Sequence, residues 1–257
     1  MILFMKQVDF TAGSLGSPVR AYILENLSSV CKSHESHPGI IILPGGGYNH
    51  ISPREGEPVA LRFAGAAYNS FVLSYPVGED IKKEKPIETV RQLVRHIAEN
   101  HERYNTDPHR LAVIGFSAGA HLAASYGTIC KGEGLKAMIL GYPVISSGPY
   151  AHNGSFDMLC QSEEERAFYS LEHRADSSTL PSFIFHSADD KVVPVENSLL
   201  FASALSRAGV DFELHVFSSA VHGTSLGTAD TGYLNERFAS WAGSAVSWLN
   251  GKLGYTT

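Results

Sequence analysis

A chain of 257 residues, of which 44% are hydrophobic, is long enough to bury a full core but short for two domains, so we expect one domain spanning residues 1–257. Its formal net charge of -6 leaves no basic stripe to neutralise phosphates, which excludes nucleic acid as the expected partner. Cys31, Cys130 and Cys160 are odd in number and widely spaced, which indicates neither a disulfide framework nor a zinc site.

The location of the chain is predicted from its apolar segments. Residues 1–6 are apolar, but they lack a basic region before a long apolar run and lack a small-residue cleavage site, so we expect no signal peptide. No run of about 18 apolar residues occurs, so we expect no membrane span. Together with the cysteine pattern, this favours a reducing, cytoplasmic setting. The sequence leaves open whether the chain forms a homo-oligomer.

Strand and helix patterns alternate along the chain. Short apolar or alternating runs predict strands at residues 8–10, 20–24, 39–43, 70–75, 111–114, 137–140, 182–186 and 212–216. Helical spacing of apolar residues predicts helices at residues 57–66, 86–98, 118–126, 195–208 and 233–249. We expect the first two strands to form an antiparallel edge. The alternation that follows predicts an α/β fold in three layers, with a mostly parallel sheet of about eight strands and helices on both faces.

Two polar segments are expected to be solvated loops. Residues 28–37 contain His34 and His37 at helical spacing, which resembles a pair of metal ligands. However, Pro38 follows at once and no third histidine is near, so we expect a loop and no metal. The charge run at residues 82–85 is also expected to face water.

The strand at residues 39–43 continues directly into a glycine loop at residues 44–50. Three successive glycines after a buried strand are either a flexible turn or a loop whose amides point at a developing negative charge. We favour the second interpretation, because this position is where α/β-hydrolases keep half of their oxyanion hole. Gly46 and Gly47 are therefore the candidate oxyanion-hole residues of this loop.

The stretch Gly115-Phe116-Ser117-Ala118-Gly119 falls where a strand pattern ends and a helix of small residues begins. This context is typical of a nucleophile elbow, in which glycines two residues on either side let strand and helix approach closely. Ser117 is the candidate nucleophile, and the amide of Ala118 is the other half of the oxyanion hole. A chance match is the alternative, because glycine is frequent in this chain.

Two later strands end in the residue types that a nucleophilic serine needs. Serine is a weak nucleophile near neutral pH, so a histidine must take its proton and a carboxylate must fix that histidine's tautomer. We choose His222, which follows the last strand pattern, over His215, which lies inside it. Only one of two adjacent residues in an extended segment can face the histidine. We choose Asp190 over its neighbour Asp189, because Asp190 lies four residues before a proline.

Two further features have more than one interpretation. His121, one turn into the helix after Ser117, is expected to pack as a helix residue and not to take part in catalysis. Residues 146–180 exceed what a plain crossover between strands needs, and they form either a small cap over the site or a peripheral helix and loop.

Taken together, four blocks resemble the acetyl-esterase and xylan-esterase-like branch of the α/β-hydrolases, which adjoins the hormone-sensitive-lipase type. The blocks are Pro44-Gly45-Gly46-Gly47-Tyr48, Asp107 to Gly119, Asp190-x-x-Val193-Pro194 and His222-Gly223. The serine, acid, histidine order is also that of this superfamily. One departure is Pro44, where the hormone-sensitive-lipase group has histidine, and it argues against a preference for lipid esters.

The resemblance implies a serine-dependent hydrolase of short-chain carboxylic esters, with acetylated carbohydrate as the expected substrate class and no cofactor or metal. Ser117 would attack the ester, His222 would act as base and then acid, and Asp190 would orient it. Tyr48, Asn49 and His50 would border the substrate pocket. An aryl formamidase or an amide hydrolase with the same residues is the alternative, although the sequence lacks the propeller domain of an oligopeptidase. A binding protein without catalysis is a further alternative.

Overall fold

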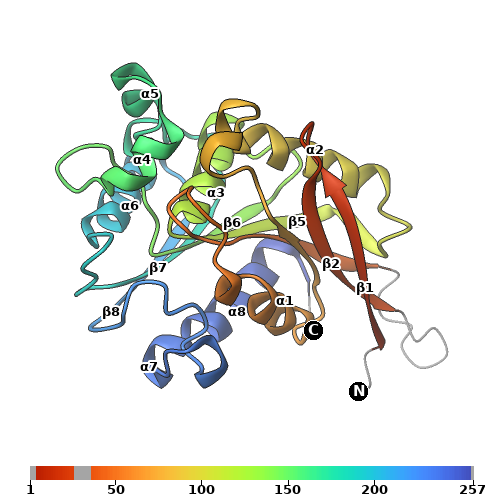
Figure 1. The fold of residues 1–257 in the computed structure, drawn as a ribbon. Coiled ribbons are helices and arrows are strands. Elements are labelled where there is room, and N and C mark those ends of the chain that lie inside the picture. Colours follow the sequence, from red (N-terminus) through yellow and green to blue (C-terminus); the bar gives the residue numbers. More distant parts are fainter. Residues whose placement is uncertain (1–3, 26–35, 256–257) are drawn as a thin grey trace.

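The computed structural model describes residues 4–25 and 36–255, and its centre is an eight-stranded sheet (Figure 1). The strands lie in the order β1-β2-β4-β3-β5-β6-β7-β8. Their bounds are β1 Phe4–Ala12, β2 Ser17–Glu25, β3 His37–Leu43, β4 Asn69–Leu73, β5 Thr106–Phe116, β6 Ala137–Gly141, β7 Ser182–Ser187 and β8 Phe212–Phe217. Strand β2 is antiparallel to both β1 and β4, and all other pairs are parallel. The predicted strand positions and the antiparallel edge are confirmed.

Helices cover both faces of the sheet and give the fold three layers (Figure 1). One face packs against α1 (Glu57–Ala64), α7 (Glu236–Ala239) and α8 (Trp241–Leu253). The other face packs against α2 (Pro86–Glu99), α3 (Ala118–Ile129) and α6 (Glu196–Ala208). Strand β5 shows why both faces are apolar: Leu111 and Val113 join one core, while Ala112 and Ile114 join the other. This is the predicted α/β-hydrolase fold.

Short elements complete the described chain. They are η1 (Pro53–Glu55), η2 (Gly78–Lys82), α4 (Asn153–Leu159), α5 (Glu163–Phe168), η3 (Leu171–His173) and η4 (Ala229–Thr231). None of the helices in the part of the chain that the structure describes is long and apolar enough to cross a membrane.

The continuous helix predicted for residues 233–249 is wrong, because the structure divides this segment into α7 and α8 at Ser240. The side chain of Asn235 accepts a hydrogen bond from the Phe238 amide and caps the start of α7. The indole of Trp241 donates to the Ser225 carbonyl and fixes the start of α8. Both helices place apolar residues on their inner faces, so the hydrophobic pattern alone does not reveal the break.

The segment containing His37 also differs from its prediction. His37 is the first residue of β3 and is buried, with Nδ1 3.0 Å from the Ala67 carbonyl oxygen. His34, like residues 26–35 as a whole, lies outside the described residues. Among the residues that are described, no three histidine, cysteine, aspartate or glutamate side chains form a group that could hold a metal ion.

Glu84 corrects the prediction that residues 82–85 are entirely solvated, because its side chain is buried under the turn between β1 and β2. Its carboxylate accepts hydrogen bonds from the Ser14 amide (3.1 Å), the Ser14 hydroxyl (3.0 Å) and the Leu15 amide (2.9 Å). Burial alone would raise the pKa of Glu84, but the hydrogen bonds from Leu15 and Ser14 outweigh it and lower the pKa below its ordinary value of 4.5.

We therefore expect Glu84→Gln to lower the free energy of unfolding by about 1–3 kcal/mol at pH 7, because the charged acceptor of the turn is lost. A lowered pKa stabilises the fold above pH 4.5, and this contribution is lost as the pH falls below that value. The difference between the two proteins should shrink between pH 7 and pH 3, as measured by urea unfolding. Glu79→Gln, at an exposed side chain on η2, is the control and should change little. An equal loss at both pH values would contradict the electrostatic explanation.

Candidate active site

Ser117 lies at the sharp turn between β5 and α3, in the backbone conformation φ 52°, ψ -117°. A non-glycine residue at positive φ is strained, and such strain persists only where the surroundings enforce it. The flanking glycines make the turn sterically feasible. A Cβ on Gly119 would lie 2.0 Å from the Leu43 carbonyl oxygen, and one on Gly115 would lie 2.1 Å from the Gly119 carbonyl oxygen. The chain therefore has the backbone geometry of a nucleophile elbow.

The structure brings Ser117, His222 and Asp190 into one chain of hydrogen bonds. The Ser117 hydroxyl lies 2.9 Å from Nε2 of His222, and Nδ1 of His222 lies 2.7 Å from Oδ2 of Asp190. Because an ionised carboxylate can only accept, Nδ1 carries the proton and Nε2 presents its lone pair to the serine hydroxyl. This arrangement matches the one that a serine nucleophile requires.

The two adjacent aspartates have different environments. The Asp190 side chain is 1% exposed, and its Oδ1 accepts hydrogen bonds from the amides of Val192 (2.8 Å) and Val193 (3.0 Å). Burial alone would raise the pKa of Asp190, but hydrogen bonds from His186 and His222 outweigh it and hold the pKa far below its usual value. Asp190 is therefore ionised across the neutral pH range.

Asp189 points away from His222 and holds neighbouring loops together. Its carboxylate accepts hydrogen bonds from the hydroxyls of Ser187 and Ser219, both at 2.7 Å, and from the Ala220 amide at 3.2 Å. These contacts join the end of β7 to the segment that leads to His222. Of the two candidates, Asp190 is the one placed against the histidine.

His186 is a neighbour of Asp190 that the sequence analysis missed. It is fully buried, and its Nε2 lies 3.0 Å from the Val193 carbonyl and 3.4 Å from Oδ2 of Asp190. A carbonyl can only accept, so the proton is on Nε2, and Nδ1 accepts from the Ser198 hydroxyl at 2.7 Å. The imidazoles of His186 and His222 thus both contact Oδ2 of Asp190 and fix its position.

The glycine loop after β3 lies beside Ser117. Gly46 has φ 126°, and a Cβ there would lie 2.0 Å from the His50 carbonyl oxygen, so this turn requires glycine. The Gly46 carbonyl accepts from the amides of Asn49 and His50 and closes the turn. Within residues 4–25 and 36–255, the amides of Gly46, Gly47 and Ala118 donate no backbone hydrogen bond. These three predicted oxyanion-hole donors are therefore available to a ligand.

A buried pair, Glu55 and Tyr142, supports this loop from behind and was also missed by the sequence analysis. One carboxylate oxygen of Glu55 accepts from the Gly45 amide at 2.8 Å, and the other accepts from the Tyr142 hydroxyl at 2.6 Å. The Tyr142 ring packs edge-on against the His222 ring, with centroids 5.0 Å apart. Burial raises the pKa of Tyr142 well above its usual value, as does the adjacent Glu55, so its hydroxyl remains a donor.

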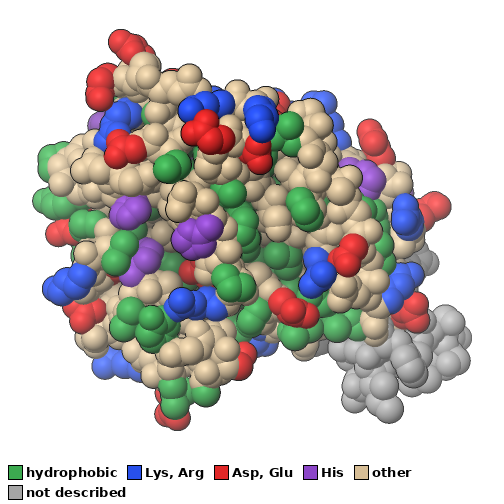
Figure 2. All heavy atoms as spheres, in the orientation of Figure 1, with side chains coloured by type: hydrophobic (Ala, Val, Ile, Leu, Met, Phe, Trp, Pro, Cys, Tyr) green, Lys and Arg blue, Asp and Glu red, His purple; other side chains and the backbone are tan. Residues whose placement is uncertain are grey.

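A cavity of about 370 Å³ opens in front of Ser117 and His222. Its lining includes Gly46, Gly47, Asn49, His50, Ser52, Arg54, Glu55, His152, Val192, Gly223 and Tyr233. Figure 2 shows histidine side chains gathered on one face of the molecule, with a basic side chain beside them. The guanidinium of Arg54 lies over the ring of Tyr233, 5.0 Å from its centroid. The cavity is thus small, and polar side chains lie among apolar surface in its wall.

The structure tests the expectations for Tyr48, Asn49, His50 and His121. Asn49 and His50 border the cavity as predicted, but Tyr48 does not, because its hydroxyl is buried against Nδ1 of His121 at 2.9 Å. His121 is a packed helix residue, as predicted, and burial lowers its pKa to about 4. Its Nε2 lies 2.9 Å from the carbonyl of Tyr169.

Residues 146–180 place His152 in the wall of the cavity. Nδ1 of His152 lies 2.9 Å from the Ser155 hydroxyl. The pKa of His152 is lowered by burial and by the neighbouring His222, so its ring is neutral near pH 7. The sequence analysis did not single out His152, because an isolated histidine in a polar segment has no distinguishing pattern.

An elbow serine, a histidine and a buried carboxylate on a sheet of this strand order define a serine hydrolase of the α/β-hydrolase fold. The model of the prolyl oligopeptidase family matches residues 78–247 of this chain. The chain therefore belongs to the prolyl oligopeptidase family.

Several of the similar proteins are described as esterases. An acetylxylan esterase from Xylanibacter ruminicola is 32% identical over 215 residues, which cover 77% of this chain and 44% of that protein. An acetyl ester-xyloside bifunctional hydrolase from Caldicellulosiruptor lactoaceticus has a similar crystal structure, with TM-score 0.82, 33% identity and coverage of 95% of this chain and 91% of that one. The carboxylesterase Cest-2923 from Lactobacillus plantarum WCFS1 has TM-score 0.86 at 25% identity over the full length of both chains. The chain spans between 35% and 51% of the length of the curated relatives that it matches.

Proposed function

We propose that this protein removes acetyl and other short acyl groups from esterified carbohydrate, with Ser117, His222 and Asp190 as its catalytic residues. The observation that carries the proposal is the hydrogen-bond chain from Asp190 through His222 to Ser117, which ends in a small cavity. His152 lines that cavity, and we propose that residues 146–180, which contain it, form a small cap within a single domain of residues 1–257.

In the proposed reaction, the Ser117 hydroxyl attacks the ester carbonyl while Nε2 of His222 takes the hydroxyl proton. Ionised Asp190 stabilises the imidazolium that forms. His222 then gives the proton to the leaving alcohol, and an acyl group remains on Ser117. Water, deprotonated by His222, attacks this acyl-enzyme and releases the carboxylic acid. The group that acts as base in each half of the reaction acts as acid when the tetrahedral intermediate collapses.

The negative charge on the carbonyl oxygen needs donors that are already in place. The amides of Gly46, Gly47 and Ala118 are the proposed donors, because Gly46 and Gly47 line the same cavity as Ser117, Ala118 follows Ser117 in the chain, and none of the three amides donates a backbone hydrogen bond in the described chain. Glu55 holds the Gly45 amide and thereby the position of the loop. Donors fixed in this way cost no reorganisation when the charge develops.

Cavity size and lining support a short acyl group and a polar alcohol. A volume of about 370 Å³ is near the lower end of the range for small-molecule sites. Asn49, His50 and His152 present polar groups suited to the hydroxyls of a sugar. Two similar proteins, an acetylxylan esterase and an acetyl ester-xyloside bifunctional hydrolase, are named for this substrate class.

We expect kcat/KM to fall in the order p-nitrophenyl acetate, butyrate, octanoate, because a cavity of about 370 Å³ leaves little room for a long chain beside the alcohol part of the ester. A hydrocarbon groove would instead return about 0.8 kcal/mol for each buried methylene and would raise the rate with chain length. Acetate release from acetylated xylo-oligosaccharide should accompany this preference. Octanoate as the best substrate would refute the short-acyl proposal. A higher kcat/KM for an aryl formamide or a peptide amide than for any ester would favour amide hydrolysis, the chemistry that the family name suggests.

A further inference from the structure

Arg54 is a basic residue in the wall of the active-site cavity that has no anionic partner in the described chain. It is half-buried and lines the cavity together with Ser117 and His222. Within residues 4–25 and 36–255, its guanidinium forms no ion pair and donates no hydrogen bond. A guanidinium has several N–H donors and keeps its charge in proteins, so these donors are available to a ligand.

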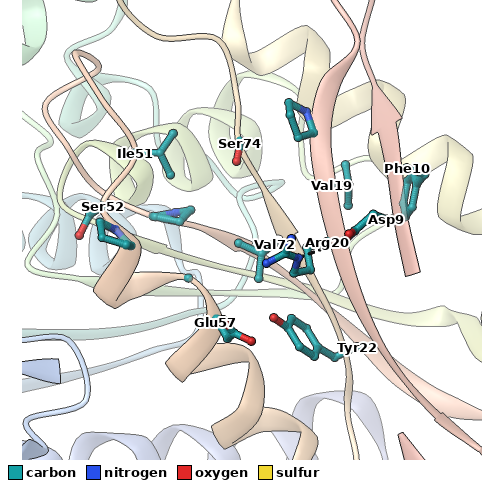
Figure 3. Close-up of a pocket in the computed structure, with 14 residues that line it drawn as sticks. Asp9, Phe10, Val19, Arg20, Tyr22, Ile51, Ser52, Glu57, Val72 and Ser74 are labelled. Carbon is teal, nitrogen blue, oxygen red and sulfur yellow. Dashed lines mark hydrogen bonds and ion pairs between the residues drawn. The ribbon is translucent and has the colours of Figure 1, made fainter. Parts of the chain in front are cut away.

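Arg20, in a neighbouring cavity, provides a comparison. Figure 3 shows this second cavity, of about 480 Å³, which shares Ser52 with the active-site cavity. Nε of Arg20 donates to Oδ1 of Asp9 at 3.1 Å, so this guanidinium is already paired with a carboxylate of the chain. A substrate anion at Arg20 would have to compete with Asp9. An anion at Arg54 would meet no such competitor among the residues that the structure describes.

Glu55 lines the same cavity as Arg54, but its carboxylate is used inside the protein. The residue is 2% exposed, and its two oxygens accept hydrogen bonds from the Gly45 amide at 2.8 Å and from the Tyr142 hydroxyl at 2.6 Å. Besides three histidines, Arg54 and Glu55 are the basic and the acidic residue of the described lining. The lining therefore offers a ligand an unpaired positive charge, whereas the acceptors of its acidic side chain are occupied. A ligand with a negative group fits this balance.

Two contacts hold Arg54 in place before any ligand binds. Its carbonyl accepts a hydrogen bond from the Ser225 hydroxyl at 2.7 Å, and its guanidinium lies over the ring of Tyr233, 5.0 Å from the centroid. The contact with the ring is a cation–π interaction, which leaves the N–H groups free to bind a planar anion. Because the side chain is partly ordered already, binding costs less conformational entropy.

These contacts also indicate which part of the substrate is negative. Ser225 and Tyr233 belong to the segment that follows His222 in the chain, and Gly223 of that segment lines the cavity. In the proposed reaction, His222 gives its proton to the leaving alcohol, so the alcohol part of the ester lies on the His222 side. The anion that Arg54 binds therefore belongs to the alcohol and not to the acyl group.

The charge of the site favours a carboxylate over a phosphate monoester. A carboxylate carries one charge and can accept two parallel hydrogen bonds from a guanidinium. A phosphate monoester carries a charge of about -1.5 to -2 at pH 7, and Arg54 would balance only one unit of it beside the acidic Glu55. A single arginine next to an acidic side chain thus suits the smaller charge.

We propose that the alcohol part of the substrate is a sugar acid, such as a uronic acid or its glycoside, whose carboxylate binds the guanidinium of Arg54. This inference rests on the proposed function and names the kind of carbohydrate ester that Ser117 cleaves. The acylated hydroxyl of the sugar lies at Ser117, and its carboxylate lies at Arg54 on the His222 side of the cavity. Tyr233 holds the guanidinium in position.

The test compares two acetylated methyl glycosides that differ only in one group on the ring, a carboxylate in the glucuronoside and a hydroxymethyl group in the glucoside. The measurement is the ratio of their kcat/KM values for acetate release. Wild type should favour the glucuronoside by about tenfold, because hydrogen bonds between charged groups are the stronger ones. Raising the salt from about 0.05 to about 0.5 M should narrow this preference, because salt screens a partly exposed charge pair.

Three variants assign the preference to one side chain. Arg54→Gln should lower the ratio to about one, and Arg54→Lys, which keeps the charge without the planar fork, should give an intermediate ratio. Arg62→Gln removes the same charge from an exposed residue of α1 outside the cavity, and it should leave the ratio unchanged. An equal loss on both glycosides in Arg54→Gln, or a lower ratio in Arg62→Gln than in Arg54→Gln, would overturn the carboxylate site.

Inhibition separates this inference from the proposed function. Unesterified methyl glucuronoside should inhibit hydrolysis of p-nitrophenyl acetate with a Ki about tenfold lower than that of methyl glucoside, and Arg54→Gln should remove this difference. Equal Ki values in wild type, or tighter inhibition by methyl glucoside 6-phosphate than by the glucuronoside, would also overturn the carboxylate site. Absence of acetate release from both glycosides would overturn the proposed function, and the inhibition constants would then decide the carboxylate site alone.

Discussion

Replacing Ser117 with alanine should lower kcat by roughly 10⁶-fold, because the nucleophile of a triad cannot be replaced by the groups that remain. The Ser117 hydroxyl contacts His222, and no other side-chain hydrogen bond of this hydroxyl occurs in the described chain, so its removal costs little stability. The variant should unfold at a temperature close to that of wild type. His222→Ala should show a loss of similar size, since residues that act as a unit are not additive.

The measurement is turnover of p-nitrophenyl acetate together with labelling by a fluorophosphonate, detected by mass spectrometry of the intact protein. Wild type should gain one phosphonyl group on Ser117, and the alanine variant should gain none. Ser125→Ala makes the same change further along α3, at a buried hydroxyl without a partner in the described chain, and should keep activity and labelling. A Ser117→Ala protein that retained a tenth of wild-type activity would remove Ser117 from its proposed role.

Local patterns in the sequence predicted the features that depend on neighbours in the chain. The apolar run before Gly115 and the small residues after Ser117 are sufficient to predict a strand, a sharp turn and a helix, because each needs only its own residues. The same holds for Gly46, whose position between a buried strand and a polar loop predicts a tight turn. Strand ends in a parallel sheet lie at one edge, so His222 and Asp190 could be assigned to the site of Ser117 from their place after strands.

The features that the sequence did not predict depend on partners far away along the chain. The Tyr142 hydroxyl reaches Glu55 across 87 residues, and Glu84 reaches Ser14 across 70. Nothing adjacent to Glu55 or Glu84 distinguishes a buried carboxylate from a solvated one. The prediction that Tyr48 borders the substrate pocket was wrong for a related reason. The backbone of Tyr48 at φ 59° directs its ring to His121, 73 residues away, and not toward the cavity.

Asp190 and Asp189 show the limit of local reasoning most directly, since they are adjacent and chemically identical. Alternation along an extended segment establishes that only one can face His222, but it does not say which. The choice depends on contacts formed after folding. Oδ2 of Asp190 meets Nδ1 of His222 at 2.7 Å, while Asp189 accepts from Ser187 and Ser219.

These contacts lead to opposite expectations for two matched substitutions. Asp190→Asn should lower kcat by about ten-thousandfold, because an amide in place of the carboxylate favours the wrong tautomer of His222 and cannot stabilise its imidazolium. Asp189→Asn should lower kcat by less than about tenfold, since only hydrogen bonds within the loop before His222 change. The Asp189 variant should instead unfold at a lower temperature, as measured by differential scanning calorimetry.

The pH dependence of activity adds a second readout for Asp190. Because the pKa of Asp190 is held far below its usual value, the carboxylate stays ionised well into the acid range, and its protonation does not limit the wild-type rate near neutral pH. The wild-type profile of kcat/KM should therefore show no loss near neutral pH from protonation of Asp190. Asparagine at position 190 removes the charge that stabilises the imidazolium, so the acid limb of the Asp190→Asn profile should move to lower pH while the Asp189→Asn profile stays in place. A larger loss of kcat in Asp189→Asn than in Asp190→Asn would assign the orienting role to Asp189. So would an acid limb that moves in Asp189→Asn and stays in place in Asp190→Asn.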